Sequence, residues 1–519
     1  MPLKTLDKQY YIMYSINQIT VMKKVPDKFT QYLQALTEED AVKISDFFAG
    51  FDKRVSISRG EKNKMRADFE NALLYYSGAG VLLDDALAGL SVENLGGFYI
   101  RPPILWYALD DAAQIFPLSM KHGKMEVFRL SVYFKTAVVP ELLQIALTFT
   151  IKRFPTFATT VKKGFFWHYL DTAKRRYSVS EESDIPCKPI KISGSSSQSF
   201  RVLYFGKRVS IECFHILTDG TGGLFFLKTL TAEYLRLLYA EKCTGEGVLD
   251  INAPPETKET SNDFALAEKT ENAPSLINKP AVQMSGKISR IKPCRILHFR
   301  MDAARLKEVA QSKNATITAY VLALMFVAVK HATDEAAGNI NIQVPVNMRK
   351  FYNSETLRNF FLFCGINLPI SRITGVDSVI SEISSQLNQK ASKQSMEEML
   401  SATRSMLNKI RYIPLFIKAP VARNTYEFFG DRVFTCTFSN VGVVKAPPQL
   451  EKYIENIDCM MGGTLTKNRA KCAMVTFGKT ATFSIVKMTA DSAFEEKMLE
   501  LFAADGIAVK AEGSELYEG

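Results

Sequence analysis

The sequence of 519 residues lacks the patterns that mark a nucleic-acid-binding or membrane-spanning protein. It has no basic block of five or six residues, because the 65 basic and 54 acidic residues behind its net charge of +11 are spread along the chain. It also has no apolar run of the ~20 residues that a membrane-spanning helix needs. These absences argue against nucleic acid as a partner and against an integral membrane segment.

Cysteine and histidine patterns for metal binding are missing as well. The eight cysteines form no C-x-x-C pair, and none lies at metal-ligand spacing from one of the five histidines, so no metal is expected. The first residues, MPLKTLDKQYYIMYSINQ, lack the leucine-rich core and the small-residue cleavage site of a secretory signal. Together with thiols in apolar stretches, this predicts a cytoplasmic protein whose cysteines stay reduced.

What the chain does contain is ordinary globular material, 47% hydrophobic and 23% charged. Domains usually hold ~100–200 residues, so several units are expected. Helical spacing of apolar residues predicts a helical N-terminal appendage over residues 1–95. Strand and helix patterns alternate over residues 96–251 and again over 294–519, and a Pro-, Lys- and Glu-rich connector separates them at 252–293. The sequence therefore predicts an α/β (α+β) fold with two similar subdomains and a ligand cleft between them.

Several individual elements can be predicted within these halves. Alternating apolar residues predict one strand in KMEVFRLSVYFKTAV and one in TTVKKGFFWHYL, while SFRVLYFGKRVSIECFHI is typical of a hairpin that turns at Gly206. A helix is expected from about Leu224. A longer helix in the second half should break near Asn314, where Thr316 or Thr318 can restart it.

The stretch ECFHILTDGTGG, residues 212–223, carries the most chemistry. Alternation along the preceding strand predicts that His215 ends its inward face, and a glycine-rich turn with Asp219 follows. A strand fixes a side chain, and glycines let a ligand approach the backbone. An inward imidazole with little charge around it stays neutral at about pH 7, so it can accept a proton as a general base.

Asp219 has two candidate roles. It can hydrogen-bond His215 directly, as in a catalytic triad, or it can turn away and hold the loop in shape by pairing with an arginine. The four-residue separation does not decide between them. Most inward histidines are structural, but the other four histidines of this chain lack a comparable setting, which favours a functional role for His215.

The segment FHILTDG resembles the H-H-x-x-x-D-G signature of the CoA-dependent acyltransferase superfamily, which includes chloramphenicol acetyltransferase and the condensation domains of peptide synthetases. Bacterial alcohol acetyltransferase-like proteins look most similar. Further stretches are similar to strands and helices of that group, among them LKEVAQSKNATITAYVLALMFVAV, VPVNMRKF and TFSNVG. The resemblance covers about residues 97–519 and implies two chloramphenicol-acetyltransferase-like subdomains with a tunnel between them.

The resemblance also implies roles for single residues. His215 would be the catalytic base that removes the acceptor's proton as the acceptor attacks an acyl thioester. Asp219 would keep the loop in shape through a salt bridge, for which Arg349 in PVNMRK is the candidate partner. Gly220 would let the acyl chain or the thioester pass close to the backbone.

In the second half, the resemblance places Ser439 and Asn440 of FSNVG where polar groups approach the tunnel. They can help to hold the tetrahedral oxyanion, or they can form a turn at a strand end. The chain departs from the family pattern at Phe214, which replaces the first histidine of the signature, a variable position that is not the base. The D-F-G-W-G motif of plant members is absent, which argues against that branch.

The resemblance thus implies a stand-alone acyltransferase. It would move an acyl group from a CoA or acyl-carrier-protein thioester to an alcohol, with an amine as the second choice of acceptor. Its partners would be small-molecule donors and acceptors and, as a candidate, an acyl carrier protein; no permanently bound cofactor is implied. The alternatives are a non-catalytic binding or scaffold protein on the same fold and a hydrolase that uses the same histidine.

Overall fold

The computed structural model describes residues 11–12, 23–24, 27–102, 104, 106–119, 125–191, 198–270, 279–425, 432–462 and 468–514. The chain divides into two compact units, residues 1–100 and 101–519. The first unit is helical, and its apolar faces meet around Phe48, Phe51 and Phe69. Its elements are β1 (Tyr11–Ile12), β2 (Lys23–Lys24), α1 (Lys28–Ala35), α2 (Glu38–Arg54), α3 (Arg59–Gly78), α4 (Leu83–Gly89) and η1 (Val92–Leu95).

The second unit contains a five-stranded sheet with the order β14-β4-β9-β8-β7, antiparallel except for the β7–β8 pair. Its strands are β4 (Val127–Phe134), β7 (Val179–Glu181), β8 (Phe200–Phe205), β9 (Arg208–Phe214) and β14 (Ile454–Met461). The hairpin predicted at Gly206 is confirmed as β8–β9. Strand β14 comes from late in the sequence but pairs with β4, so the two lobes of this unit are not contiguous along the chain.

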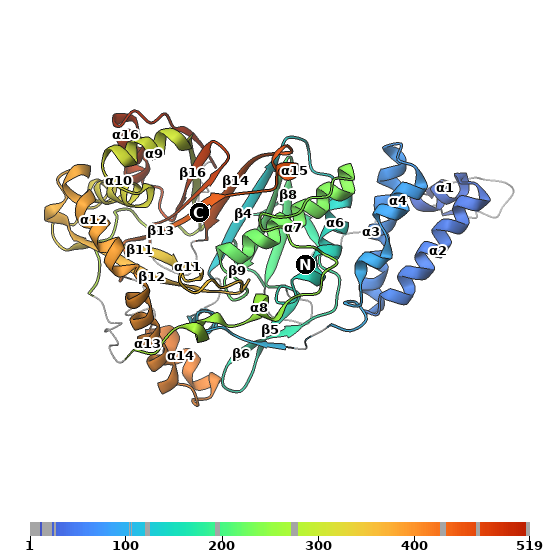
Figure 1. Ribbon diagram of the computed structural model, residues 1–519, viewed down its shortest axis with the longest axis horizontal. Helices are drawn as coiled ribbons and strands as arrows, with labels where there is room; N and C mark the ends of the chain where they lie inside the picture. The colour runs from blue at the N-terminus through green and yellow to red at the C-terminus, as the bar shows by residue number, and fades with distance from the viewer. Residues whose placement is uncertain are drawn as a thin grey trace. The chain divides into compact units, whose positions relative to one another are not determined.

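Helices α6 (Pro140–Thr150) and α7 (Gly220–Tyr239) pack against each other over this sheet (Figure 1). Phenylalanine rings fill the space between the helices and the strands: Phe157 stacks on Phe226 with centroids 4.4 Å apart, and Phe200 meets both. The helix expected from about Leu224 begins four residues earlier, at Gly220.

A seven-stranded mixed sheet forms the second lobe, with the order β12-β11-β13-β15-β16-β10-β17. Its strands are β10 (Arg295–Asp302), β11 (Asn339–Asn347), β12 (Phe361–Pro369), β13 (Cys436–Val444), β15 (Ala470–Phe477), β16 (Thr480–Lys487) and β17 (Lys510–Gly513). The helices that follow along the chain from residue 303 are α9 (Ala303–Ser312), α10 (Ile317–His331), α11 (Arg349–Tyr352), η4 (Ile370–Arg372), α12 (Val376–Lys390), α13 (Lys393–Lys409), α14 (Leu415–Thr425), α15 (Pro448–Glu451) and α16 (Ala493–Ala504). The predicted helix break is confirmed: Asn314 has φ +53°, and Thr316 caps α10 by accepting from the N–H of Ala319 at 3.1 Å.

Helix α10 lies in the core of the second lobe, where ten of its fifteen residues are buried. Within the described ranges no single helix is long and apolar enough to cross a bilayer. Only α9 and α10 taken together reach the required length, and they bend by 80° where they meet.

A small third sheet has the order β3-β6-β5, with β3 (Trp106–Ala108), β5 (Thr159–Lys163) and β6 (His168–Thr172). The single strand expected in TTVKKGFFWHYL is wrong, because this segment is a hairpin. It turns at Gly164, whose N–H donates to the carbonyl of Trp167 at 2.9 Å. A side chain at Gly164 would begin 2.7 Å from that carbonyl oxygen, which explains the glycine.

The stretch expected to be a connector is folded where the structure describes it. It contains α8 (Thr257–Thr260) and η3 (Asp263–Leu266). Arg153 of the first lobe donates two hydrogen bonds of 2.5 Å to the buried carboxylate of Glu259, and the carbonyl of Glu259 accepts from the N–H of Leu357 in the second lobe. The connector therefore joins the lobes through specific contacts.

Candidate functional site

His215 directly follows β9 and begins the loop that leads into α7. Its backbone N–H donates to the carbonyl of Glu126 at 3.0 Å, and the preceding residue, Phe214, is fully buried opposite Val127 of β4. The β4–β9 pairing therefore fixes the position of the imidazole. Phe214, which replaces a histidine in the family signature, belongs to the core.

Three phenylalanine rings surround the half-buried imidazole of His215. Phe116, from α5 (Ile115–Ser119), stacks on it at 5.2 Å between centroids; Phe128 of β4 lies at 4.8 Å, and Phe361 of β12 at 5.0 Å. Burial lowers the pKa of His215 below its ordinary range, although the carboxylates of Glu126 and Asp219 act in the opposite direction. The ring is therefore neutral near pH 7, as the sequence led us to expect.

Asn359 contacts the imidazole from the second lobe and defines its tautomer. The amide nitrogen of Asn359 donates to the carbonyl of His215 at 2.9 Å and to Oδ2 of Asp110 at 3.3 Å. The amide oxygen consequently faces Nδ1 of His215, 3.2 Å away, and can only accept, so Nδ1 carries the hydrogen. Nε2 then keeps its lone pair, and within the described part of the chain it has no hydrogen-bond partner.

A buried ion pair supports Asn359 from behind. Asp110 is fully buried, and Nη2 of Arg358 lies 3.4 Å from its Oδ2. Burial raises the pKa of Asp110 to about 6, against the opposing effect of Arg358. Arg358 also donates to the carbonyl of Ala108 at 2.6 Å. The amide of Asn359 is thereby held in one orientation by groups from both lobes.

Asp219 turns away from the imidazole and acts on the backbone. Its Oδ1 accepts from the N–H groups of Thr221 and Gly222 at 3.1 and 3.2 Å, which caps α7. Its Oδ2 accepts from Nη1 of Arg349 at 2.7 Å and from the N–H of Phe360 at 2.9 Å. Of the two roles that the sequence left open, the structure contains the arginine pairing, and the partner is Arg349.

The glycines of the loop differ in their surroundings. They form the first turn of α7 and not a separate turn before it, because the cap at Asp219 starts the helix there. A Cβ on Gly222 would lie 2.0 Å from the carbonyl oxygen of Leu357, so only glycine fits against the second lobe. A Cβ on Gly220 would meet no atom within 4 Å. The space beside Gly220 is therefore open, while Gly222 is required by packing.

A second ion pair joins the lobes near the histidine. Nζ of Lys471, on β15, lies 2.7 and 2.9 Å from the two carboxylate oxygens of Glu126, the residue whose carbonyl accepts from His215. Glu126 raises the pKa of His215 and Lys471 lowers it. The pair therefore brings a charge of each sign close to the imidazole.

Ser439 and Asn440 lie on β13 of the second lobe. The amide nitrogen of Asn440 donates to the hydroxyl of Thr318 at 2.9 Å, and its amide oxygen accepts from the N–H of Gly442 at 2.9 Å. Gly442 has φ +84°, and the β13–β15 register shifts between these two residues, so Asn440 stabilises a strand bulge. Ser439 is half-buried, and its hydroxyl is bonded to none of the described residues.

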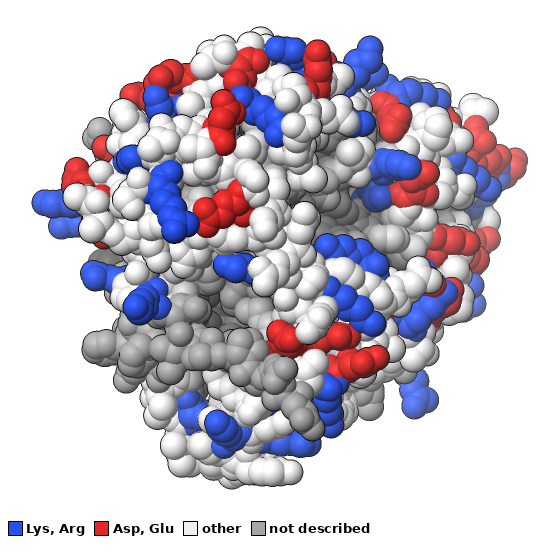
Figure 2. All heavy atoms as spheres, turned by 60° about the vertical axis from the view of Figure 1, so that its left-hand side comes forward, with Lys and Arg blue, Asp and Glu red and all other residues white. Residues whose placement is uncertain are grey.

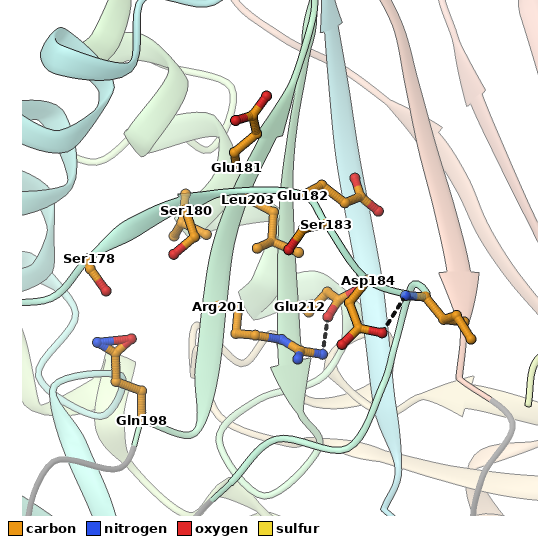
Figure 3. Close-up of a pocket in the computed structure, with 12 residues that line it drawn as sticks. Ser178, Ser180, Glu181, Glu182, Ser183, Asp184, Gln198, Arg201, Leu203 and Glu212 are labelled. Carbon is orange, nitrogen blue, oxygen red and sulfur yellow. Dashed lines mark hydrogen bonds and ion pairs between the residues drawn. The ribbon is translucent and has the colours of Figure 1, made fainter. Parts of the chain in front are cut away.

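A separate polar cavity of about 240 Å³ lies beside β7, β8 and β9 (Figure 3). Its lining includes Glu181, Arg201 and Glu212, and Arg201 contacts Glu212 directly. Glu212 is fully buried and also accepts from Nε of Arg129 at 2.9 Å. Both faces of β9 are therefore buried, whereas alternation predicted one inward face. His215 is not part of this lining, so we do not place the reaction there.

Sequence reasoning missed the residues that orient His215. Asn359 and Arg358 are two adjacent polar residues in LRNFFLF, just before an apolar strand, and Asp110 lies in YALDDAAQ. Polar residues next to apolar strands are common, so they are a weak sign of a functional role. That Asn359 contacts His215, 144 positions away in the sequence, is visible only in the tertiary structure. In the described ranges, no group of three or more His, Cys, Asp or Glu side chains is arranged to hold a metal ion.

Comparisons with known proteins identify the fold. No family model and no curated protein matches the sequence. Among solved structures, Fusarium sporotrichioides TRI101 complexed with coenzyme A and T-2 superposes with a TM-score of 0.54, covering 79% of this chain and 100% of that one at 11% identity. Polyketide synthase associated protein 5 from Mycobacterium tuberculosis gives 0.52, with 78% and 98% covered at 11% identity. TRI3 trichothecene 15-O-acetyltransferase from F. sporotrichioides gives 0.50, with 77% and 94% covered at 12% identity.

Identities this low show the fold and not the activity. The predicted fold is confirmed: the chain has the mixed α/β, two-lobed, chloramphenicol-acetyltransferase-like fold shared by these acyltransferases. The boundaries of the two subdomains and the tunnel between them remain predictions.

Proposed function

We propose that the protein is an acyltransferase that moves an acyl group from a coenzyme A or acyl-carrier thioester to an alcohol, with Nε2 of His215 as the general base. One observation carries the proposal: a neutral imidazole, with Nδ1 tied to Asn359 and Nε2 unpaired, lies where residues of both lobes meet in a fold that known acyltransferases share. The unpaired Nε2 is the atom that a general base needs.

The reaction follows from this geometry. Nε2 removes the proton of the acceptor hydroxyl as its oxygen attacks the thioester carbonyl, which forms a carbon–oxygen bond and a tetrahedral oxyanion. The oxyanion collapses, the carbon–sulfur bond breaks, and the thiolate takes the proton from the imidazolium. The products are an ester and a free thiol. While the ring is positively charged, the hydrogen bond from Nδ1 to Asn359 becomes stronger, so it stabilises the transition state more than the ground state.

Other residues have supporting roles in this proposal. Asp219 and Arg349 hold the loop, and the open space beside Gly220 suits a thioester that passes close to the backbone. The unbonded hydroxyl of Ser439 is the second-lobe candidate for the oxyanion, whereas the amide of Asn440 is engaged in the bulge. The net charge of +11 favours an anionic donor such as coenzyme A or an acidic carrier protein. TRI101, a structural neighbour, is crystallised with coenzyme A.

The test is release of free thiol from short- to long-chain acyl-CoAs, with and without alcohol acceptors. We expect acceptor-dependent release, and a kcat about 10²–10⁴-fold lower in His215→Ala, the usual loss when a general base is removed. His331→Ala, which changes an exposed histidine at the end of α10, is the matched control and should keep full activity.

The alternatives give different results. Thiol release without an acceptor would identify a hydrolase. No release with any donor would favour a binding or scaffold protein, and equal turnover by His215→Ala would remove the mechanism.

A further inference from the structure

An unusual number of large apolar side chains is exposed at one end of the second unit. Phe165 and Phe166 form the tip of the β5–β6 hairpin, and Phe165 is 66% exposed. Tyr412, in the loop before α14, is 74% exposed, and Phe416 on α14 is 72% exposed. Ile413, Ile417 and Met406 are exposed as well. We call these seven residues the apolar tip.

The two segments of the apolar tip form one surface. The N–H of Leu415 donates to the carbonyl of Phe165 at 2.8 Å, and the rings of Phe166 and Tyr412 lie 6.2 Å apart. Beneath them, Nζ of Lys418 lies 3.1 Å from the ring centroid of Trp167. Soluble monomers rarely expose a contiguous apolar patch of this kind unless it binds something.

The exposed charges next to the tip are basic. Residues 399–422 contain four basic and no acidic side chains, namely Arg404, Lys409, Arg411 and Lys418, and the hairpin adds Lys162 and Lys163. Arg404 is paired with Asp111 at 2.7 Å, and Lys418 is buried under the tip. Lys163, Lys409 and Arg411 are exposed. Figure 2 shows white and blue surface without red at the lower end of the molecule, where α13 and α14 lie in Figure 1. Exposed aromatic residues bordered by cations are typical of protein surfaces that insert into the interface of an anionic bilayer.

The apolar tip is also connected to the candidate site. Leu415 and Ala419 of α14 pack on Leu118 of α5, and Phe116 of the same short helix stacks on His215. The helix that carries the tip residue Phe416 is therefore packed on the short helix whose Phe116 stacks on the imidazole.

From these observations we infer that the apolar tip docks on the surface of an anionic lipid bilayer. A bilayer accounts for both features of the tip, since its interface accepts separate aromatic side chains and its lipid headgroups attract the surrounding cations. A protein partner or a second copy of the chain would need an apolar surface bordered by acidic side chains to match both features. The inference goes beyond the proposed acyl transfer, and vesicle binding can be measured without any substrate.

The experiment is co-sedimentation of the full chain with vesicles of phosphatidylcholine, alone or with phosphatidylglycerol at about 30 mol%. We expect binding to the anionic vesicles at least about tenfold tighter than to the neutral ones, and weaker at high salt. Phe165→Ser combined with Phe416→Ser should weaken binding at least about tenfold, because two inserted rings are lost. Lys409→Glu with Arg411→Glu should remove the preference for anionic lipid.

Phe205→Ser is the matched control. Phe205 is 57% exposed but lies in the β8–β9 turn, at the opposite end of β9 from His215, so its loss should leave vesicle binding unchanged. The inference is overturned if the chain ignores anionic vesicles, or if the Phe165/Phe416 variant binds them as well as the natural chain. It is also overturned if that variant only dissociates an oligomer in light scattering, which would identify the tip as a contact between copies. Acyl transfer to a water-soluble acceptor is measured in a separate assay, so a negative result for one proposal does not contradict the other.

Discussion

Replacing Asn359 with alanine tests how the fold prepares the histidine. In the natural chain the amide oxygen accepts from Nδ1 of His215 at 3.2 Å, and the amide nitrogen is held by the carbonyl of His215 and by Asp110. A hydrogen bond between neutral groups contributes about 1 kcal/mol, and one to a charged group about 1.5–3 kcal/mol. The bond therefore gains about 0.5–2 kcal/mol when the ring becomes an imidazolium, which corresponds to a kcat about 2- to 30-fold lower without it.

Two readouts separate this effect from general loosening. KM should change little, because Nδ1 faces away from the reacting atoms. In the natural chain, the acid limb of the kcat/KM profile should lie below about pH 6.5. In the variant, the acid limb should move to lower pH. The hydrogen bond from Asn359 raises the pKa of His215, so its loss makes the ring harder to protonate.

Thr218→Val is the matched control for Asn359→Ala. The hydroxyl of Thr218 donates to the carbonyl of Leu357 at 2.6 Å, so it ties the same two segments together without touching the imidazole. This variant should lose stability but keep the position of the acid limb. Equal losses of kcat in both variants, or an acid limb that moves to higher pH in Asn359→Ala, would refute the reasoning; circular dichroism checks that both variants fold.

The remaining predictions concern the loop. Asp219→Ala should lower the free energy of unfolding by about 3–5 kcal/mol in urea titrations, because it removes a helix cap and leaves buried Arg349 without its carboxylate. Full stability of this variant, with activity as low as in His215→Ala, would instead indicate a triad. Gly222→Ala should cost at least about 3 kcal/mol, since its Cβ would collide with the carbonyl of Leu357. Gly220→Ala should keep full stability and raise KM for the acyl donor, and an unchanged KM would argue against passage of the donor there.

Local patterns were enough to predict much of this protein. Alternation and helical spacing depend on neighbours in the chain, so the β8–β9 hairpin, the helix after His215 and the break at Asn314 followed from the residues themselves. The motif around His215, together with the further stretches that resemble the same superfamily, named the fold that the structural neighbours confirm. The neutral state of the ring was also expected, but the phenylalanine rings that bury it come from distant segments of the chain.

Contacts between distant segments could not be predicted from such local patterns. Strand β14 joins the sheet of the first lobe, and Asn359 contacts His215 from the second lobe. Neither contact can be predicted from a local period, because both depend on how the lobes pack. Asp219 shows the division most clearly: its spacing from His215 allowed either of two roles, and the position of Arg349, 130 residues further on, selected one of them. Side chains near in sequence share a pattern, whereas the partner of a buried charge depends on which segments folding brings next to it.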